Sequence, residues 1–339
     1  MLLQGLLAAC PAARLRAAFL DERARTQLVL PAGVGSVEWV RPSARSRLGA
    51  EQSLRAVTRS GDTVLCFHGL PPLLPNAGRV VVFQQNRNYL GLNPLSQFSA
   101  RTALRLGFER LVSRMFRRRV AEYIVQTPTM ARHLGHWYHK GSHARGPVIR
   151  VLPFIDTFPL AMVAGASRAT EWEFVYVSDG EAHKNHRCLL QAWQLLAEQG
   201  LRPRLALTLG PRDSALAQDV QALRANSGAE VHNLGHLPRE QVLELYGAAR
   251  ALIFPSTSES FGLPLIEAQH LGVPILAPEL DYVRDVCSPV QTFDPRSPVS
   301  IARAVRRFLA QPEAPLVIGQ PADLWRALLA EDASAGPQQ

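Results

Sequence analysis

The stretch Phe254–Ala268, FPSTSESFGLPLIEA, decides the fold, and Gly272-Val273-Pro274 follow it. An apolar run ends at its first residue, small polar residues come next, and Pro264 stands where the first turn of a helix tolerates proline. A strand, a loop and a helix that begins near Leu263 are therefore expected in this order. Gly262 lets the backbone come close to a ligand, and the free amides of a helix N-terminus favour an anion. The stretch predicts one unit of a parallel α/β sheet, with an anion site where its strand ends.

The same stretch contains two glutamates, Glu259 in the loop and Glu267 in the helix. We expect both to face one cleft at the carboxyl edge of the sheet. Carboxylates are poorly suited to bind phosphate, but they accept hydrogen bonds from sugar hydroxyls, as an acidic residue does for ribose in dinucleotide sites. The pair therefore predicts a site for a sugar joined to phosphate. The alternative is a solvated helix start with two surface glutamates.

Outward from this unit, short β-branched runs alternate with longer amphipathic runs along almost the whole chain. This alternation predicts an α/β protein with two doubly wound, Rossmann-like parallel sheets. Strands are expected at residues 27–30, 37–40, 63–67, 79–83, 123–126, 148–152, 174–178, 205–209, 230–234, 251–254, 274–277 and 290–293, and helices in the second half at 183–198, 213–225, 239–249 and 264–271. The expected division is an N-terminal domain at 1–152, a linker at 153–170, a C-terminal domain at 171–312, a helical segment at 313–330 and a loose tail at 331–339.

The composition and the charge limit the class of protein. The 339 residues are 47% apolar and 19% charged, which excludes a largely disordered chain. Residues 1–150 carry 22 Lys and Arg against 7 Asp and Glu, a net charge of +15, whereas the remaining residues carry −6. This asymmetry suggests that the N-terminal half faces something anionic. No apolar run approaches the roughly 18 residues that span a bilayer.

The cysteines and histidines do not predict disulfides or a metal centre. The four cysteines lie far apart without a Cys-x-x-Cys pair, which fits a reducing cytoplasm. His133, His136, His139 and His143 are close in sequence, but glycines interrupt their helix and no carboxylate is near. We therefore expect no bound metal.

A second strand-to-helix junction, Val175–His186, contains one of the two lysines of the chain. Lys184 stands at the start of the expected helix, where its charge can neutralise a leaving diphosphate. The effect of that charge would be largest in a closed, dry cleft. The alternative is a surface lysine at a helix start.

The pattern of Glu, seven residues, Glu, with Phe-Gly-Leu-Pro between the glutamates and Gly-x-Pro after them, resembles family 4 of the retaining glycosyltransferases, of the bacterial O-antigen mannosyltransferase-like kind. The resemblance extends over most of residues 171–310 and implies the GT-B fold, in which two Rossmann-like domains face a cleft. It implies that Glu259 holds hydroxyls of the donor sugar, Glu267 the nucleotide ribose, and Lys184 the phosphates. Further donor contacts are implied for Phe261, Gly262, Leu263, Gly210 and Leu237. Ordinary turns explain the last two equally well.

The chain departs from this family in three places. An arginine that often precedes the lysine is absent, and Ser178 and Asp179 stand there instead. Residues 1–9 read as the helix that follows the first strand and its glycine-rich loop, so we expect the N-terminal sheet to lack that inner strand. A histidine often found beside the reacting carbon is also absent after the strand at 80–83. On the acceptor side we expect His68 as its nearest substitute, although a loop histidine without such a role is equally consistent, together with Gln85, Asn86 and Arg87.

Residues 101–119 contain seven arginines and one glutamate. At helical spacing, Leu104, Phe108, Leu111 and Met115 form one stripe, and arginines at 110, 114 and 117 form another. A basic amphipathic helix of this kind can lie against anionic lipid headgroups. The alternative is a core-facing helix with a solvated arginine face.

Together these features predict a hexosyltransferase of cell-surface polysaccharide synthesis, such as lipopolysaccharide synthesis. It would move a sugar from a nucleotide-diphosphate donor to a glycan or polyprenyl-linked acceptor with retained anomeric configuration. No cofactor and no metal are expected, and the enzyme would work in the cytoplasm, on the inner face of the plasma membrane. The rivals are a nucleotide-sugar epimerase-like GT-B protein and a basic nucleic-acid-binding protein. No basic motif with interleaved aromatic residues supports the latter, so nucleic acid is not an expected partner.

Overall fold

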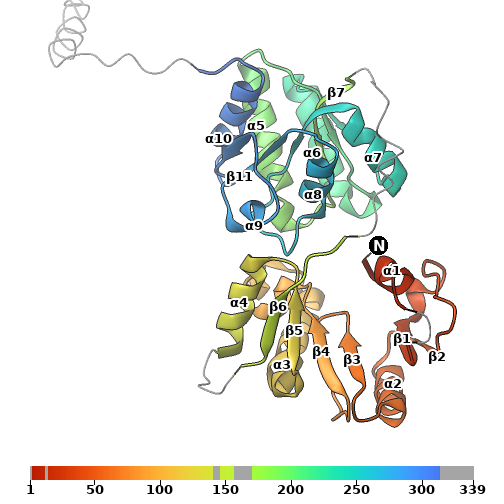
Figure 1. Ribbon diagram of the computed structural model, residues 1–339. Helices are drawn as coiled ribbons and strands as arrows, with labels where there is room; N and C mark the ends of the chain where they lie inside the picture. The colour runs from red at the N-terminus through yellow and green to blue at the C-terminus, as the bar shows by residue number, and fades with distance from the viewer. Residues whose placement is uncertain (1, 12–13, 140–145, 156–169, 314–339) are drawn as a thin grey trace, which may run out of the picture.

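The computed structural model describes residues 2–11, 14–139, 146–155 and 170–313. They form two α/β domains, one above the other in Figure 1. The expected linker at 153–170 and the expected segments at 313–330 and 331–339 lie almost entirely outside the described residues.

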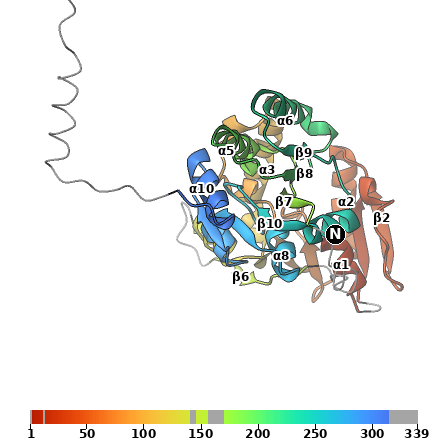
Figure 2. The same ribbon diagram turned by 90° about the horizontal axis from the view of Figure 1, so that it is seen from above.

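The C-terminal domain has one parallel sheet in the order β12-β11-β10-β7-β8-β9. Figure 2 shows α5 and α6 on one side of these strands and α8 on the other, as in a doubly wound sheet. The strands are β7 Trp172–Tyr176, β8 Leu205–Leu207, β9 Val231–Asn233, β10 Ala249–Ile253, β11 Ile275–Pro278 and β12 Gln291–Phe293. The helices are α5 His186–Glu198, α6 Ser214–Ser227, α7 Arg239–Gly247, α8 Leu263–His270, α9 Asp281–Arg284 and α10 Pro298–Phe308.

The N-terminal domain has two separate parallel sheets. Within the described residues, β1 pairs only with β2, and the larger sheet has the order β3-β4-β5-β6. The strands are β1 Ala17–Asp21, β2 Ser36–Val40, β3 Thr63–Cys66, β4 Arg79–Phe83, β5 Glu122–Val125 and β6 Val148–Val151. The helices are α1 Leu2–Ala8, α2 Ala44–Val57, α3 Ala100–Phe116 and α4 Pro128–His139.

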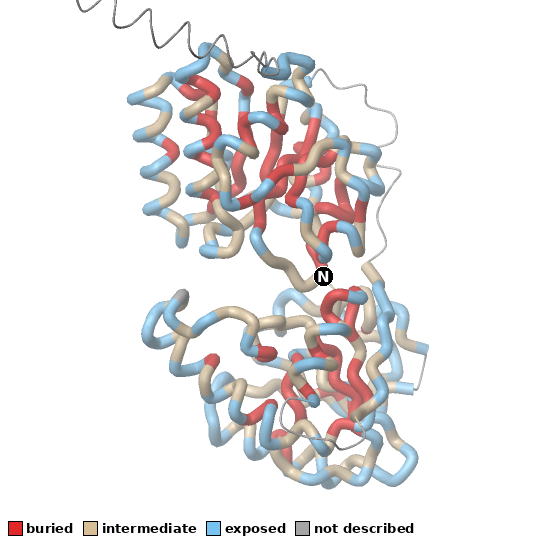
Figure 3. Tube along the Cα trace, turned by 90° about the vertical axis from the view of Figure 1, so that its left-hand side faces the viewer, coloured by how far each residue is buried: buried red, intermediate tan, exposed pale blue. Residues whose placement is uncertain are grey.

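The buried residues gather along both larger sheets, as the red segments of Figure 3 show. The C-terminal core is the more extensive and includes five large, fully buried aromatic side chains. These are Phe174, Tyr176, Trp193, Tyr246 and Phe254. This packing fixes the strand ends, and therefore the loops that follow them, in place.

One expected strand is wrong and one strand was not expected. Residues 27–30 form no strand, because the side-chain amide of Gln4 bonds both the N–H and the carbonyl of Val29, at 2.8 and 3.1 Å. The strand lies earlier, at β1, where Ala17–Asp21 contains no β-branched residue. The helix expected from residue 183 also begins later, at His186, because Asn185 has a left-handed backbone with φ of 64°.

No helix in the described part of the chain is long and apolar enough to cross a membrane.

Candidate active site

The strand order of the C-terminal sheet reverses between β7 and β10, because the chain moves outward from β7 in one direction and from β10 in the other. In open parallel sheets such a point leaves a crevice at the carboxyl ends of the two strands, where ligands bind. Lys184 follows β7 and Glu259 follows β10. The fold thus places both residues at the position where a ligand site is expected.

Lys184 and Glu259 form an ion pair, with Nζ 2.8 Å from Oε1. Their side chains are only 18% and 10% exposed. The two loops that carry them are also joined through the backbone, since the N–H of Thr257 donates to the carbonyl of His183 at 2.8 Å. The prediction that the two strand-to-helix junctions form one site is therefore supported by a direct contact between their charged residues.

Two buried tyrosines hold the loops that carry Lys184 and Glu259. Tyr176 donates its hydroxyl to the carbonyl of Lys184 at 2.8 Å and contacts the hydroxyl of Ser256 at 3.3 Å. Tyr282 donates to the carbonyl of Ser256 at 2.6 Å. Burial raises the pKa of both tyrosines, so they stay neutral donors and hold the loops without adding charge.

Asn185 is a support that the sequence analysis missed. Its left-handed backbone turns the chain between Lys184 and α5, and its side-chain amide donates to the carbonyls of Pro255 and Pro295 at 3.2 and 2.6 Å. Asparagine is one of the few residues other than glycine that adopts this conformation readily. An asparagine between a strand-end lysine and a helix was therefore a signal that could have been used.

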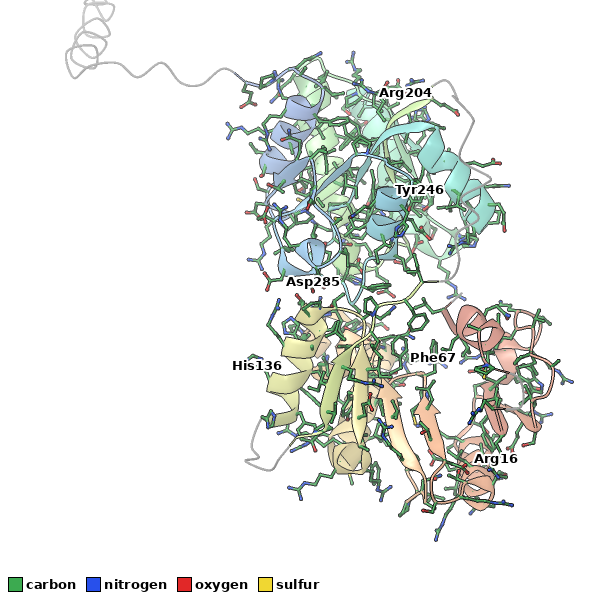
Figure 4. The ribbon with its side chains drawn as sticks, viewed as in Figure 1. Arg16, Phe67, His136, Arg204, Tyr246 and Asp285 are labelled. Atoms are coloured by element: carbon green, nitrogen blue, oxygen red, sulfur yellow. The ribbon has the colours of Figure 1, made fainter. Side chains whose placement is uncertain are left out.

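Glu267 lies in α8 and is 6% exposed. Its carboxylate accepts a hydrogen bond from the hydroxyl of Tyr246 at 3.3 Å and lies 3.4 Å from the guanidinium of Arg239. Burial raises the pKa of Glu267, while Arg239 and the Tyr246 hydroxyl act in the opposite direction. In Figure 4 Tyr246 lies beside α8. The alternative of two surface glutamates is wrong, because both carboxylates are largely buried and each faces a cation.

The start of α8 is suited to an anion. Gly262 has φ of 73°, a left-handed conformation, and precedes the first helical residue, Leu263. Phe261 is buried before it, and the first turn contains no acidic side chain. The positive end of the helix is therefore not neutralised from within its own first turn.

The loops expected to meet the nucleotide lie next to one another. Asn233 accepts from the N–H groups of Leu209 and Gly235, at 2.9 and 3.2 Å, and so joins the loops after β8 and β9. A Cβ at Gly210 would lie 3.7 Å from His236, and Leu237 packs half-buried against the core. The structure thus brings Gly210 and Leu237 to neighbouring loops, which is what a shared pocket requires.

Of the four residues expected on the acceptor side, Arg87 is the one with a hydrogen bond to Glu259. Its Nη1 donates to the carbonyl of Glu259 at 3.1 Å. Asn86 caps the short helix that follows it by accepting from Asn88 N–H at 2.9 Å, so its side-chain oxygen is already used. His68 is exposed, and its ring has no hydrogen bond or ion pair within the described residues. In Figure 4 the neighbouring Phe67 lies at the edge of the N-terminal sheet that faces the C-terminal domain.

Among the described residues, neither a metal centre nor either of two surface hollows is a better candidate for the functional site. The described residues hold no cluster of three His, Cys, Asp or Glu suited to a metal, and His143 lies outside them. A hollow of about 620 Å³ lies between α5 and α6, and another of about 370 Å³ borders the end of α6. Neither is lined by the paired charges described above, so their volume does not make them better candidates.

Comparison with known proteins finds similarity in the C-terminal half of the chain. Residues 161–325 match the family model described as "Glycosyl transferases group 1". O-antigen chain mannosyltransferase B of Escherichia coli is 38% identical over 139 residues, which is 40% of this chain and 34% of that protein. The serotype-specific mannosyltransferase WbdA of Escherichia coli is 30% identical over 148 residues, 43% of this chain and 18% of that protein. The aligned part thus spans about a third or less of these relatives.

The fold also matches solved structures. The crystal structure of Anabaena HepE in complex with UDP and glucose superposes with a TM-score of 0.59 at 14% identity, covering 87% of this chain and 90% of that one. At this identity the likeness concerns the fold alone. The predicted GT-B architecture is confirmed.

Proposed function

We propose that this chain, whose residues 161–325 match the glycosyl transferase group 1 family model, transfers a hexose from a nucleotide-diphosphate donor to a hydroxyl of a glycan or lipid-linked acceptor. The observation that carries the proposal is the Lys184–Glu259 ion pair, 2.8 Å long, at the point where the strand order reverses. The mannosyltransferase names of the Escherichia coli relatives support the reaction class and a role in cell-surface polysaccharide synthesis. The UDP and glucose held by HepE support the donor class.

In this proposal the sugar, the ribose and the diphosphate of the donor each contact a different part of the site. The sugar hydroxyls bond to Glu259, and the ribose hydroxyls bond to Glu267, whose carboxylate is oriented by Arg239 and Tyr246. The diphosphate lies between Lys184 and the amides at the start of α8. Donor binding then requires Lys184 to share its ammonium between Glu259 and a phosphate oxygen.

The proposed transfer does not require a side chain of the protein to act as a strong general base. The bond between the anomeric carbon and the diphosphate oxygen breaks, and the acceptor oxygen bonds to the same face of that carbon. The proton of the acceptor hydroxyl passes to the departing phosphate oxygen. Lys184 and the α8 terminus stabilise the negative charge that develops on the diphosphate, so catalysis rests on orientation and electrostatics. No metal or cofactor is assigned a step, because these groups supply the positive charge.

We also propose that α3 rests on an anionic membrane surface. Leu104, Phe108, Leu111 and Met115 are 79%, 65%, 55% and 62% exposed, so the alternative of a core-facing apolar stripe is wrong. The expected arginine stripe needs correction, because Arg110 points inward and donates to the carbonyls of Asn88 and Asn93, both at 2.7 Å. The exposed arginines of residues 101–119 are Arg101, Arg105, Arg114 and Arg118. Arginine around exposed apolar side chains complements anionic headgroups.

A thermal-shift panel of nucleotide-diphosphate sugars followed by a transfer assay tests the proposed activity. The panel should include GDP-mannose and UDP-glucose, with the matching nucleoside diphosphates and an RNA oligonucleotide. A rise in melting temperature with one sugar nucleotide, and transfer of its sugar to a polyprenyl-linked glycan, is expected. Binding of RNA without binding of any sugar nucleotide contradicts the proposal.

A further inference from the structure

The C-terminal half of the site has little free positive charge for a diphosphate. The ammonium of Lys184 is paired with Glu259 at 2.8 Å, and the guanidinium of Arg239 lies 3.4 Å from Glu267. At the end of β7, Ser178 adds no charge and Asp179 adds a negative one. A diphosphate is strongly anionic, so a further cation would improve the electrostatic balance of the bound state.

Arg87 from the N-terminal domain is that cation. It begins the short helix η2, Arg87–Leu90, after β4, and its Nη1 donates to the carbonyl of Glu259 at 3.1 Å. No carboxylate forms an ion pair with Arg87 in the described part of the chain. Its Nε is buried and has no hydrogen-bond partner among the described residues. The side chain therefore brings an unpaired charge and an unused donor to the residue that binds Lys184.

The loop that carries Arg87 is held firmly. Arg110 of α3 donates to the carbonyls of Asn88 and Asn93, and the side-chain amide of Gln84 donates to the carbonyl of Asn86 at 2.8 Å. These bonds fix the loop before any ligand arrives. A guanidinium on a fixed loop loses less conformational freedom on binding than one on a mobile loop.

We infer that Arg87 is a phosphate-binding residue which completes the site from the N-terminal domain. Its planar guanidinium would take phosphate oxygens, either of the donor diphosphate or of a phosphorylated lipid acceptor. Because it also bonds the carbonyl of Glu259, Arg87 couples phosphate binding to the contact between the two domains. This inference rests on the proposed function and names the residue that adds the missing charge.

Isothermal titration of four proteins tests the inference: the full-length chain, Arg87→Gln, Arg87→Lys and the control Arg55→Gln, whose arginine is exposed on α2. The probes are UDP and GDP for the donor, the nucleosides uridine and guanosine, and farnesyl phosphate in detergent for a lipid phosphate. Arg87→Gln is expected to weaken the phosphate-bearing ligand by about tenfold or more, as expected for a lost charge-assisted hydrogen bond. Arg87→Lys should lose less, and Arg55→Gln should match the unmodified chain.

The outcomes separate the two phosphate sources. Weaker binding of the nucleoside diphosphate alone assigns Arg87 to the donor, and weaker binding of farnesyl phosphate alone assigns it to the acceptor. If the unmodified chain binds these probes and Arg87→Gln binds them equally well, the inference is overturned while the proposed function stands. An equal loss for nucleosides and nucleoside diphosphates also overturns it, because the effect is then not on phosphate. If the unmodified chain binds no nucleotide or sugar nucleotide, the proposed function fails.

Discussion

At the scale of single residues, the ion pair between Lys184 and Glu259 is the feature with the most direct consequence. Both side chains are largely buried, and each neutralises the other in the ligand-free protein. In the proposed reaction, the donor must therefore replace part of this ion pair when it binds. Substitution of either residue should separate its role in binding from its role in turnover.

Glu259→Gln should lower kcat by about a hundredfold, because an amide orients the donor sugar less well than a carboxylate does. The affinity for a nucleoside diphosphate should not fall, since Lys184 is released from its carboxylate partner. Steady-state transfer kinetics and nucleotide titration measure the two effects. Glu240→Gln, at an exposed position of α7, is the matched control. An unchanged kcat would remove Glu259 from the proposed mechanism.

The proposed role of Glu267 predicts that the affinity for a nucleoside depends on pH. Burial raises its pKa above the ordinary glutamate value, so on acidification it takes up a proton earlier than an exposed carboxyl does. The protonated group accepts hydrogen bonds from ribose less well. The affinity for a nucleoside should therefore fall as the pH drops towards the raised pKa, whereas the affinity for its 2′,3′-dideoxy analogue should change less. Parallel pH profiles for the two ligands would contradict the assignment of Glu267 to ribose.

At the scale of secondary-structure elements, most of the strands could be predicted because they are β-branched or continuously apolar. β1 could not, since Ala17–Asp21 lacks β-branched residues, and the false strand at 27–30 is bonded by a single side chain from α1. The strand-loop-helix unit with Glu259 and Glu267 could be read directly from spacing. The contacts that Arg239 and Arg87 make with this unit could not, because Arg239 begins α7 and Arg87 begins η2, and only the fold brings them close to the two glutamates.

The exposed stripe of α3 predicts membrane binding that depends on two of its apolar residues. A Leu104→Asn/Phe108→Asn double variant should keep its melting temperature, because both side chains are already exposed. Its partition onto vesicles that contain phosphatidylglycerol should fall by about tenfold or more, since it loses buried apolar area at the headgroups. Vesicle sedimentation at low and high salt measures this.

Val299→Asn, a change of an exposed apolar residue on α10, is the control for this experiment. It should sediment like the unmodified chain. If the unmodified chain does not bind anionic vesicles at low salt, the proposed membrane surface is wrong.

At the scale of the whole molecule, the two domains meet through a small set of polar contacts. The N–H of Thr129, in the first turn of α4, donates to a carboxylate oxygen of Asp285 at 2.8 Å, and Arg132 pairs with Asp281 at 3.2 Å. In Figure 4 Asp285 lies at the lower edge of the C-terminal domain, directly above α4. The hydroxyl of Thr127 also lies 3.4 Å from the carbonyl of Ser260, next to Glu259. These contacts hold the N-terminal domain against the loop that carries Glu259 and against α9.

Asp285→Ala should favour separation of the domains, because it removes an anion from a helix N-terminus, an interaction of about 0.3–1 kcal/mol. A larger radius of gyration at low salt is expected in small-angle X-ray scattering, and the difference should shrink as salt screens the unmodified contact. Asp219→Ala, exposed on α6, is the control. An unchanged radius would show that this contact does not hold the domains together.

The buried ammonium of Lys184 has a practical consequence, because 35 of the 37 basic residues are arginine and the only other lysine is Lys140. Amine-selective acylating reagents therefore have very few side chains to modify in this protein. The extent of acylation of Lys184, measured by mass spectrometry, would report whether a bound ligand protects its side-chain nitrogen. Occupancy of the site could then be followed in a cell extract without radioactive sugar and without knowing the acceptor.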